Sequence, residues 1–344
     1  MELELSGSIE QQEEALMKYR VLIMEKMDPS GPEFLQSHGC EVRFSTSSSE
    51  EEYLQEIRAW NPHGLFVRSF PVTSEMMEAA PALRAISVHG TGYDNIDIFH
   101  AADRQIQVLH LPEGNYVSVA EHALFLIMAC AKRYGLTRDP FRNGDYDVRY
   151  RVTDGQELRQ KTLGIIGWGH SGQELGRMAV EGLRMNLLVW TGGRPMAPTP
   201  WGPVCQAESR DRLLEYSDFI ALCLPSTPET RYGITYQDFV KMKKSACLIN
   251  TSRGSLLREE DLIRALQEGL IRGAGLDVFD QEPPDPRSPL LTMDQVIATP
   301  HFAAVTEDAM YRMSLEGAQE LYKALTGGNP QWPVRAGHQT ARGS

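Results

Sequence analysis

Residues 163–172 read Leu-Gly-Ile-Ile-Gly-Trp-Gly-His-Ser-Gly, and the organisation of the whole chain can be worked out from this segment. The apolar run Leu163 to Ile166 predicts a strand, and Gln173 to Leu183 predicts a helix. A GxGxxG sequence between a strand and a helix is typical of a turn that binds the pyrophosphate of a dinucleotide. A second strand, predicted over Leu187 to Trp190, completes the unit in which this motif is specific.

Each glycine of the motif has a predicted role. Gly167 permits the tight turn, Gly169 lets the pyrophosphate approach the backbone, and Gly172 lets the helix pack closely on the strand. His170 and Ser171 lie in the predicted loop, where we expect them to bind the cofactor through their backbone. The N-terminus of the following helix then faces the negative phosphates.

Strands and helices alternate along the rest of the chain, which favours parallel sheets covered on both faces. The second half is predicted to contain six strands, the number of a doubly wound dinucleotide fold. These strands are Leu163–Ile166, Leu187–Trp190, Phe219–Leu222, Ala246–Ile249, Gly273–Val278 and Val296–Ala298. In the first half the predicted strands are Val21–Met24, Val42–Phe44, Leu65–Val67 and Ala85–Val88, and the predicted helices are Glu33–His38, Glu50–Trp60 and Thr73–Ala79.

Two further helices set the expected domain boundaries. Ser118 to Ala131 predicts a long buried helix that begins with a capping box, and Thr306 to Leu325 predicts a helix that returns to the first domain. We therefore predict an α/β protein with two doubly wound parallel sheets, a Rossmann domain being inserted in a discontinuous flavodoxin-like domain. The expected bounds are 20–115 plus 305–335 for the substrate domain, 116–304 for the dinucleotide-binding domain, and 1–19 and 336–344 for flexible ends.

Composition excludes several other classes of protein. The 344 residues include 34 Lys+Arg and 46 Asp+Glu, a net charge of −12, which argues against nucleic acid as a partner. The N-terminus, Met1 to Glu14, lacks the pattern of a secretory signal, and the longest apolar run, Ala123 to Ala131, is far shorter than a bilayer requires. Five scattered cysteines are expected to be reduced core residues of a cytoplasmic protein.

The second strand of the dinucleotide unit ends in a sequence that bears on cofactor choice. An NAD site usually has Asp or Glu there to bind the ribose hydroxyls, whereas this strand ends Trp190-Thr191-Gly192-Gly193-Arg194. No acid would repel a 2′-phosphate, and the Arg194 guanidinium could bind one. The sequence therefore favours NADP(H), and NAD(H) remains the alternative if Arg194 is only a surface residue.

Three titratable residues follow predicted strands of the second sheet. Arg253, Glu282 and His301 all come after the carboxyl end of a strand, the edge at which open α/β sheets bind ligands. His301 suits proton transfer, Glu282 could orient it, and Arg253 could bind a substrate carboxylate. Taken singly, these residues would be better interpreted as a surface charge, a turn residue and a polar strand end.

The sequence does not support metal-dependent or serine hydrolysis. His89 and His122 are interpreted as hydrogen-bonded structural residues. There is no HExxH, no GxSxG and no Cys/His cluster with zinc spacing, so no metal is expected.

The chain resembles the D-isomer-specific 2-hydroxyacid dehydrogenases from about Arg20 to Leu325. The motifs that carry the resemblance are His89-Gly-Thr-Gly-Tyr-Asp-Asn-Ile-Asp97, Val119-Ala-Glu-His122, the glycine motif, Asn250-Thr-Ser-Arg-Gly254, Leu276-Asp-Val-Phe279 with Glu282-Pro283, and Thr299-Pro-His301.

The resemblance assigns expected roles to individual residues. It implies that Arg253 anchors the substrate and polarises its carbonyl group, that His301 is the acid/base and that Glu282 orients it. The amides of Thr91 and Gly92 would hold the substrate carboxylate. Further residues would contact the cofactor: Leu224, Pro225, Thr251 and, at the nicotinamide amide, Asp277. It also implies a homodimer.

The expected function is reduction of a small 2-keto acid by NADP(H), with glyoxylate or hydroxypyruvate as first substrates to try, because the cofactor strand is similar to that of glyoxylate/hydroxypyruvate reductases. Two alternatives stay open within the resemblance. One is an NAD enzyme like D-3-phosphoglycerate dehydrogenase, and the other is a dinucleotide-gated binding protein like the corepressors of this family. The intact set of Arg, Glu and His argues against an inactive scaffold.

Overall fold

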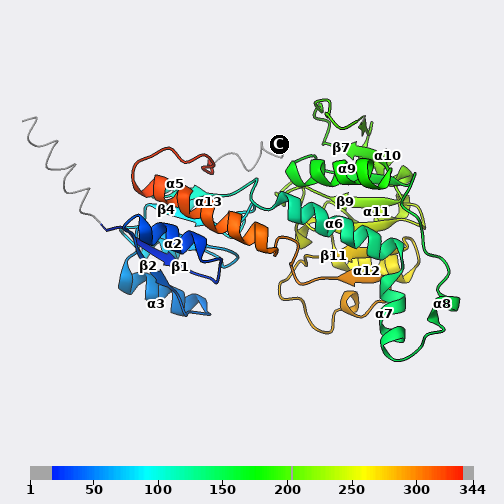
Figure 1. Ribbon diagram of the computed structural model, residues 1–344, viewed down its shortest axis with the longest axis horizontal. Helices are drawn as coiled ribbons and strands as arrows, with labels where there is room; N and C mark the ends of the chain where they lie inside the picture. The colour runs from blue at the N-terminus through cyan, green and yellow to red at the C-terminus, as the bar shows by residue number, and fades with distance from the viewer. Residues whose placement is uncertain (1–17, 203, 336–344) are drawn as a thin grey trace, which may run out of the picture. The chain divides into compact units, whose positions relative to one another are not determined.

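A computed structural model describes residues 18–202 and 204–335 of the chain (Figure 1). The described residues divide into two compact units, the first made of 18–115 with 307–335 and the second of 116–306. The expectations about Met1 to Glu14 and about flexible ends lie outside the described residues, apart from Lys18 and Tyr19. Tyr19 is buried, and its ring meets the ring of His63 edge-on.

The first unit is built on a five-stranded parallel sheet in the order β2-β1-β3-β4-β5, which is the flavodoxin order. Its strands are β1 (Arg20–Ile23), β2 (Glu41–Phe44), β3 (Gly64–Val67), β4 (Ala85–Val88) and β5 (Gln107–Leu109). The sequence predicted the first four to within one residue. It missed β5, because three residues are too few to show a pattern.

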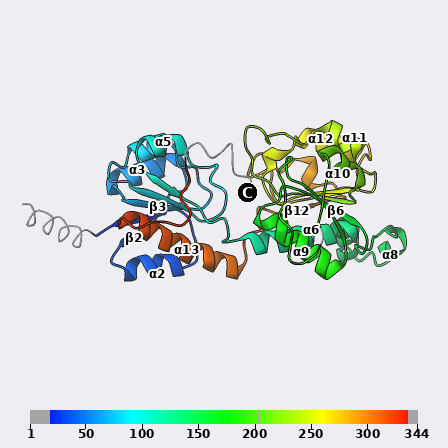
Figure 2. The same cartoon turned by 90° about the horizontal axis from the view of Figure 1, so that it is seen from above.

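Helices cover both faces of this sheet: α2 (Ser30–Ser37), α3 (Glu50–Trp60), α4 (Ser74–Glu78), α5 (Ile98–Asp103) and α13 (Glu307–Leu325). Successive residues of a strand point to opposite faces. Val21 and Ile23 therefore pack in one core with α2 and α13, and Leu22 packs in the other with α3, α4 and α5. Figure 2 shows α2 and α13 side by side, with α3 and α5 across the sheet from them.

The second unit is built on a seven-stranded parallel sheet in the order β12-β11-β10-β9-β6-β7-β8. Its strands are β6 (Thr162–Ile166), β7 (Asn186–Trp190), β8 (Cys205–Gln206), β9 (Phe219–Leu222), β10 (Cys247–Asn250), β11 (Gly273–Leu276) and β12 (Val296–Ala298). This is the Rossmann order, and it reverses between β6 and β9. Ligands of open α/β sheets bind at such a reversal. The two parallel doubly wound sheets confirm the predicted fold class.

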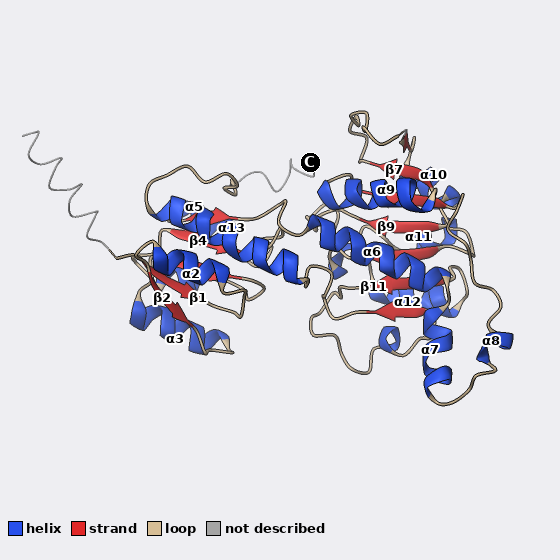
Figure 3. Ribbon diagram, in the orientation of Figure 1, coloured by secondary structure: helices blue, strands red, loops and turns tan. Residues whose placement is uncertain are grey.

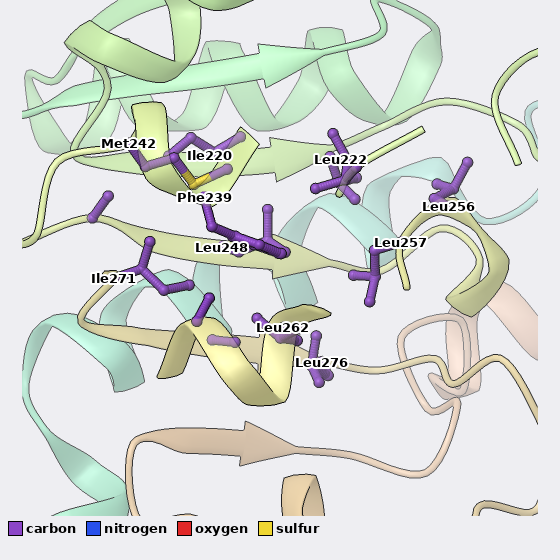
Figure 4. Close-up of a cluster of buried hydrophobic side chains, with 14 of the residues drawn as sticks. Ile220, Leu222, Phe239, Met242, Leu248, Leu256, Leu257, Leu262, Ile271 and Leu276 are labelled. Carbon is purple, nitrogen blue, oxygen red and sulfur yellow. The ribbon is translucent and has the colours of Figure 1, made fainter. Parts of the chain in front are cut away.

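Seven helices belong to the second unit: α6 (Tyr116–Ala131), α7 (Tyr134–Arg142), α8 (Val148–Arg151), α9 (His170–Leu183), α10 (Arg210–Tyr216), α11 (Tyr236–Lys241) and α12 (Glu259–Gln267). Helices α6 and α9 pack on one face of the sheet, and α10, α11 and α12 pack on the other. Figure 2 shows the strands between these two helix layers, and Figure 3 shows the strands in red and the helices in blue. Figure 4 shows the core under α11 and α12, in which Phe239, Leu248 and Leu262 are fully buried.

Several predictions about local structure were wrong. Helix α6 begins at Tyr116, so Ser118 is its third residue rather than its cap, and its hydroxyl lies 2.8 Å from that of Thr306. Helix α9 begins at His170 rather than Gln173. The predicted strand to Val278 ends at Leu276, and the short helix α8 was not predicted.

The cysteines differ in burial, and Cys223 is intermediate. All five are free, and Cys40, Cys130 and Cys247 are buried as expected. Cys205 on β8 is exposed, which corrects the interpretation of every cysteine as a core residue. In the described part of the chain, no helix is both long and apolar enough to cross a membrane.

Candidate active site

The glycine turn lies at the reversal point of the second sheet. Gly167 has φ 97°, and a Cβ there would come within 2.2 Å of the Cys223 carbonyl oxygen, so only glycine fits. That Cβ would also lie 3.0 Å from Leu224, which together with Pro225 follows β9. Helix α9 begins directly after Gly169.

His170, Ser171 and Gly172 thus form the first turn of α9 rather than a loop, and the first amides of a helix have no partner within it. A narrow glycine cradle beside a helix N-terminus fits a dinucleotide pyrophosphate. Thr251 follows the neighbouring strand β10 at the same edge and is largely buried.

A compact turn follows β7. The hydroxyl of Thr191 donates to the carbonyl oxygen of Arg194 and accepts a hydrogen bond of 2.9 Å from the Gln206 side-chain amide. Gln206 Nε2 also donates to the Arg194 carbonyl oxygen at 2.7 Å, and Arg194 Nε donates to the Thr191 carbonyl oxygen at 3.3 Å. Thr191 is 8% exposed, so its hydroxyl is used inside the turn, whereas Arg194 is exposed.

His301 and Glu282 form a hydrogen-bonded pair. His301 Nδ1 lies 2.7 Å from Glu282 Oε2, and Glu282 Oε1 accepts a 3.0 Å bond from the Phe279 amide. Burial alone would raise the pKa of Glu282. The contact with His301, the Phe279 amide and the charge of Arg253 outweigh it and lower that pKa, so the carboxylate is ionised.

Arg253 reaches this pair through an unusually close backbone contact. A Cβ at Gly254 would lie 1.9 Å from the carbonyl carbon of Phe279, so glycine lets the Arg253 segment run against the Phe279 segment. Asn250 Nδ2 donates to the Arg253 carbonyl oxygen at 2.8 Å and fixes the turn after β10. The structure therefore brings Arg253, Glu282 and His301 together in one unit, as the strand-end argument predicted.

Asp277 has surroundings that the sequence did not reveal. Its carboxylate is fully buried and accepts hydrogen bonds from Thr299 Oγ1 at 2.6 Å and from the amides of Phe302 and Ala303 at 2.8 Å each. Burial opposes ionisation, but these donors and His122 together lower the pKa of Asp277. A contact with nicotinamide stays a prediction for this residue.

Thr91 and Gly92 belong to the first unit and follow β4. The Thr91 hydroxyl donates to the Leu111 carbonyl oxygen at 3.1 Å, and the Thr91 carbonyl oxygen lies 2.9 Å from His110 Nδ1. Among the described residues, the amides of Thr91 and Gly92 donate to no protein acceptor. Two such amides are suited to bind a carboxylate.

The two structural histidines differ. His122 lies 2.9 Å from Thr299 Oγ1, which confirms its interpretation as a hydrogen-bonded residue. His89 is buried, but among the described residues its ring nitrogens have no hydrogen-bond partner of good geometry, so the same interpretation is not confirmed for it. Burial and the charge of Arg68 lower the pKa of His89 to about 4.

Sequence reasoning missed two residues of this region, Thr299 and Gln206. Thr299 belonged to a recognised motif, and its place one residue past β12 could have indicated it. Gln206 gave no signal, because its contacts depend on the pairing of the short strand β8. Among residues 18–202 and 204–335, no group of three His, Cys, Asp or Glu side chains is arranged to hold a metal ion.

The fold and the glycine turn define a dinucleotide-binding protein of Rossmann type. Residues 124–303 match the family model described as D-isomer specific 2-hydroxyacid dehydrogenase, NAD binding domain. A hydroxypyruvate reductase of Thermotoga maritima is 34% identical, and the match covers 90% of this chain and 99% of that protein. The chain belongs to the D-isomer specific 2-hydroxyacid dehydrogenase family.

Two other relatives differ in name. A D-3-phosphoglycerate dehydrogenase of Methanocaldococcus jannaschii is 36% identical over 90% of this chain, and the match spans only 58% of that protein's length. The structure of an NADPH-dependent glyoxylate/hydroxypyruvate reductase from Sinorhizobium meliloti, in complex with NADP and malonate, is 26% identical with a TM-score of 0.79. It covers 92% of this chain and 97% of its own.

Proposed function

We propose that this protein transfers a hydride between NADP(H) and a small 2-keto or D-2-hydroxy acid, with glyoxylate and hydroxypyruvate as the first substrates to test. The observation that carries the proposal is the 2.7 Å contact of His301 with Glu282, with the charge of Arg253 beside it, at the carboxyl edge of a dinucleotide-type sheet. A keto acid needs a proton donor and a cation during reduction, and this set provides both.

The protein's part in the reaction follows from this geometry. A nicotinamide cofactor supplies the hydride when bound at the glycine turn. Because Nδ1 of His301 is held by Glu282, Nε2 is the nitrogen that donates a proton to the substrate carbonyl oxygen. The ionised Glu282 stabilises the protonated imidazole, and Arg253 binds the carboxylate and polarises the carbonyl group. One keto acid, one reduced cofactor and one proton give one hydroxy acid and the oxidised cofactor.

Cofactor choice is proposed to depend on Arg194. The turn after β7 carries no carboxylate that would repel a 2′-phosphate, and Arg194 is exposed at its tip. A guanidinium binds phosphate with paired charged donors. Thr191 supports this function through its bonds within the turn rather than by contacting the cofactor with its hydroxyl.

Three further parts of the proposal come from the family resemblance. Thr91 and Gly92 bind the substrate carboxylate through their amides, Leu224, Pro225 and Thr251 line the cofactor, and Asp277 contacts the nicotinamide. The resemblance also implies a homodimer. The cysteine pattern is the separate basis for placing the protein in the cytoplasm, where the free thiols of Cys40 and Cys247 would stay reduced.

A second candidate is an NAD-dependent dehydrogenase of D-3-phosphoglycerate. The 36% identity to an enzyme of that name favours it. The two candidates differ in substrate charge and in cofactor, so one panel of assays separates them.

The test is steady-state turnover on a panel of 2-keto acids, including glyoxylate, hydroxypyruvate and phosphohydroxypyruvate, each with NADPH and with NADH. We expect NADPH-dependent reduction of the small acids. His301→Gln and Arg253→Ala should lose about 10²- to 10⁴-fold in kcat/KM while keeping wild-type circular dichroism. Wild-type turnover in both variants would refute the assigned roles. Cofactor binding without turnover of any acid would favour the corepressor-like alternative.

A further inference from the structure

Three polar side chains meet behind the turn that carries His301. His122 comes from α6, Asp277 follows β11, and Thr299 follows β12. His122 Nε2 lies 2.9 Å from Thr299 Oγ1 and 3.4 Å from Asp277 Oδ1, and Thr299 Oγ1 lies 2.6 Å from the same carboxylate oxygen. The side chain of His122 is 14% exposed and that of Asp277 is 0% exposed. Polar groups buried this deeply persist because they are hydrogen-bonded.

The direction of each hydrogen bond can be assigned. Donors around Asp277 lower its pKa, so the carboxylate is ionised and only accepts. The Thr299 hydroxyl, which has a single proton, therefore donates its hydrogen bond to Asp277. That leaves the hydroxyl oxygen to accept from His122, whose Nε2 must carry a hydrogen. His122 thus donates to Thr299, and Thr299 donates to Asp277.

Asp277 in turn holds the backbone around His301. Its carboxylate accepts from the amides of Phe302 and Ala303, and its own carbonyl oxygen accepts from the amide of His301 at 2.7 Å. His301 has φ 52°, a left-handed conformation that is unfavourable for a residue with a side chain. Three bonds to one residue offset that cost, and in this conformation the ring of His301 meets Glu282.

We propose that His122 and Thr299 are positioning residues for His301: the donor on His122 orients the Thr299 hydroxyl, which keeps the Asp277 carboxylate on the amides of Phe302 and Ala303. The inference rests on the proposed function, because it gives His301 the proton transfer. Neither residue touches the substrate in this role. If both served only to fill the core, then any side chain of similar size would replace them without a specific effect on the chemical step.

The decisive comparison is Thr299→Val with Thr299→Ser. Valine keeps the shape and removes the hydroxyl, whereas serine keeps the hydroxyl. Similarly, His122→Phe removes the donor and His122→Gln supplies one from an amide. We expect kcat for the keto acid to fall about 10- to 100-fold in Thr299→Val and His122→Phe, with the Kd of NADPH within about 2-fold of wild type. Thr299→Ser and His122→Gln should recover most of kcat.

Two further measurements separate positioning from general damage. The double variant His122→Phe/Thr299→Val should be no slower than the worse single variant, because both break one chain. Thermal unfolding of each variant reports on the fold. If His122→Phe does not fold, the comparison of Thr299→Val with Thr299→Ser decides the question, because valine is nearly isosteric with threonine.

Three results would overturn the proposal. One is wild-type kcat in a folded Thr299→Val. Another is a loss in Thr299→Ser equal to that in Thr299→Val. The third is a parallel loss of kcat, NADPH affinity and thermal stability, which is the mark of a residue that only packs. Wild-type turnover in His301→Gln would instead refute the proposed function itself, so the two failures are distinguishable.

Discussion

Glu282 illustrates how one residue combines opposing effects. Its partial burial disfavours a charge, but His301, the Phe279 amide and the charge of Arg253 lower its pKa, so an ionised carboxylate lies against the imidazole. A carboxylate in this position favours the protonated ring, which is the form that reduction of a keto acid uses. The pair therefore places a negative charge against the ring that is proposed to donate the proton.

Glu282→Gln tests this interpretation. The amide of glutamine keeps the shape of the side chain but carries no negative charge to stabilise the protonated ring, so we expect kcat/KM for reduction to fall about 10²-fold. The measurement is kcat/KM with saturating cofactor, compared with that of the wild type. A folded variant with wild-type kcat/KM would show that the Glu282 carboxylate has no influence on the proton donor.

His89 gives a prediction about stability rather than activity. The residue is 4% exposed, and burial, together with the charge of Arg68, lowers its pKa from 6.5 to about 4. Between these pH values the unfolded chain binds a proton that the folded chain does not. The free energy of unfolding therefore falls as the pH drops through this window.

The free energy of unfolding is expected to fall by about 3 kcal/mol between pH 7 and pH 4 because of His89 alone. The variant His89→Gln has no charge to gain, so it should lose correspondingly less stability over the same range. Urea denaturation of both proteins at several pH values measures the difference. A gap between the two proteins that does not change with pH would contradict the account.

At the scale of elements, strand positions were the most predictable part of the fold. Runs such as Phe219–Leu222 and Leu65–Val67 are buried on both faces, so their sequences are continuously apolar and their bounds are clear. The strand Cys205–Gln206 has two exposed residues and exists because it pairs with Leu188 and Val189. A local pattern does not reveal an element of that kind.

The same strand leads to a prediction about cofactor choice. Gln206 bonds both ends of the turn that presents Arg194, so Gln206→Ala should loosen this turn. We expect the preference for NADPH over NADH to fall about 3- to 10-fold, with NADH kinetics unchanged, because only the 2′-phosphate contact is affected. Cys205→Ala, at the neighbouring exposed position of β8, is the matched control.

If the NADPH preference is unchanged in both Gln206→Ala and Arg194→Ala, then Arg194 does not bind the 2′-phosphate. If Arg194→Ala abolishes the preference but Gln206→Ala does not reduce it, then the turn holds its shape without Gln206.

At the scale of the whole molecule, each unit has its own hydrophobic core. The clusters that contain Phe239 and Leu175 draw only on residues 116–306, and those that contain Leu22 and Leu35 draw only on the rest. Arg253, Glu282 and His301 were predictable together because parallel strands end at one edge. The links among His122, Asp277 and Thr299 were not, because they depend on side-chain packing between a helix and two strand ends.

The most direct test of hydride transfer follows the hydride itself. The wild-type protein is given glyoxylate or hydroxypyruvate with NADPH that carries deuterium at the transferable position, and the product is analysed by mass spectrometry and chiral chromatography. We predict one deuterium on the carbon that bore the keto group, the D configuration when hydroxypyruvate is the substrate, and a rate about 10²- to 10⁴-fold lower in His301→Gln. A product without deuterium, an L product, or an equal rate in His301→Gln would contradict the proposed reaction.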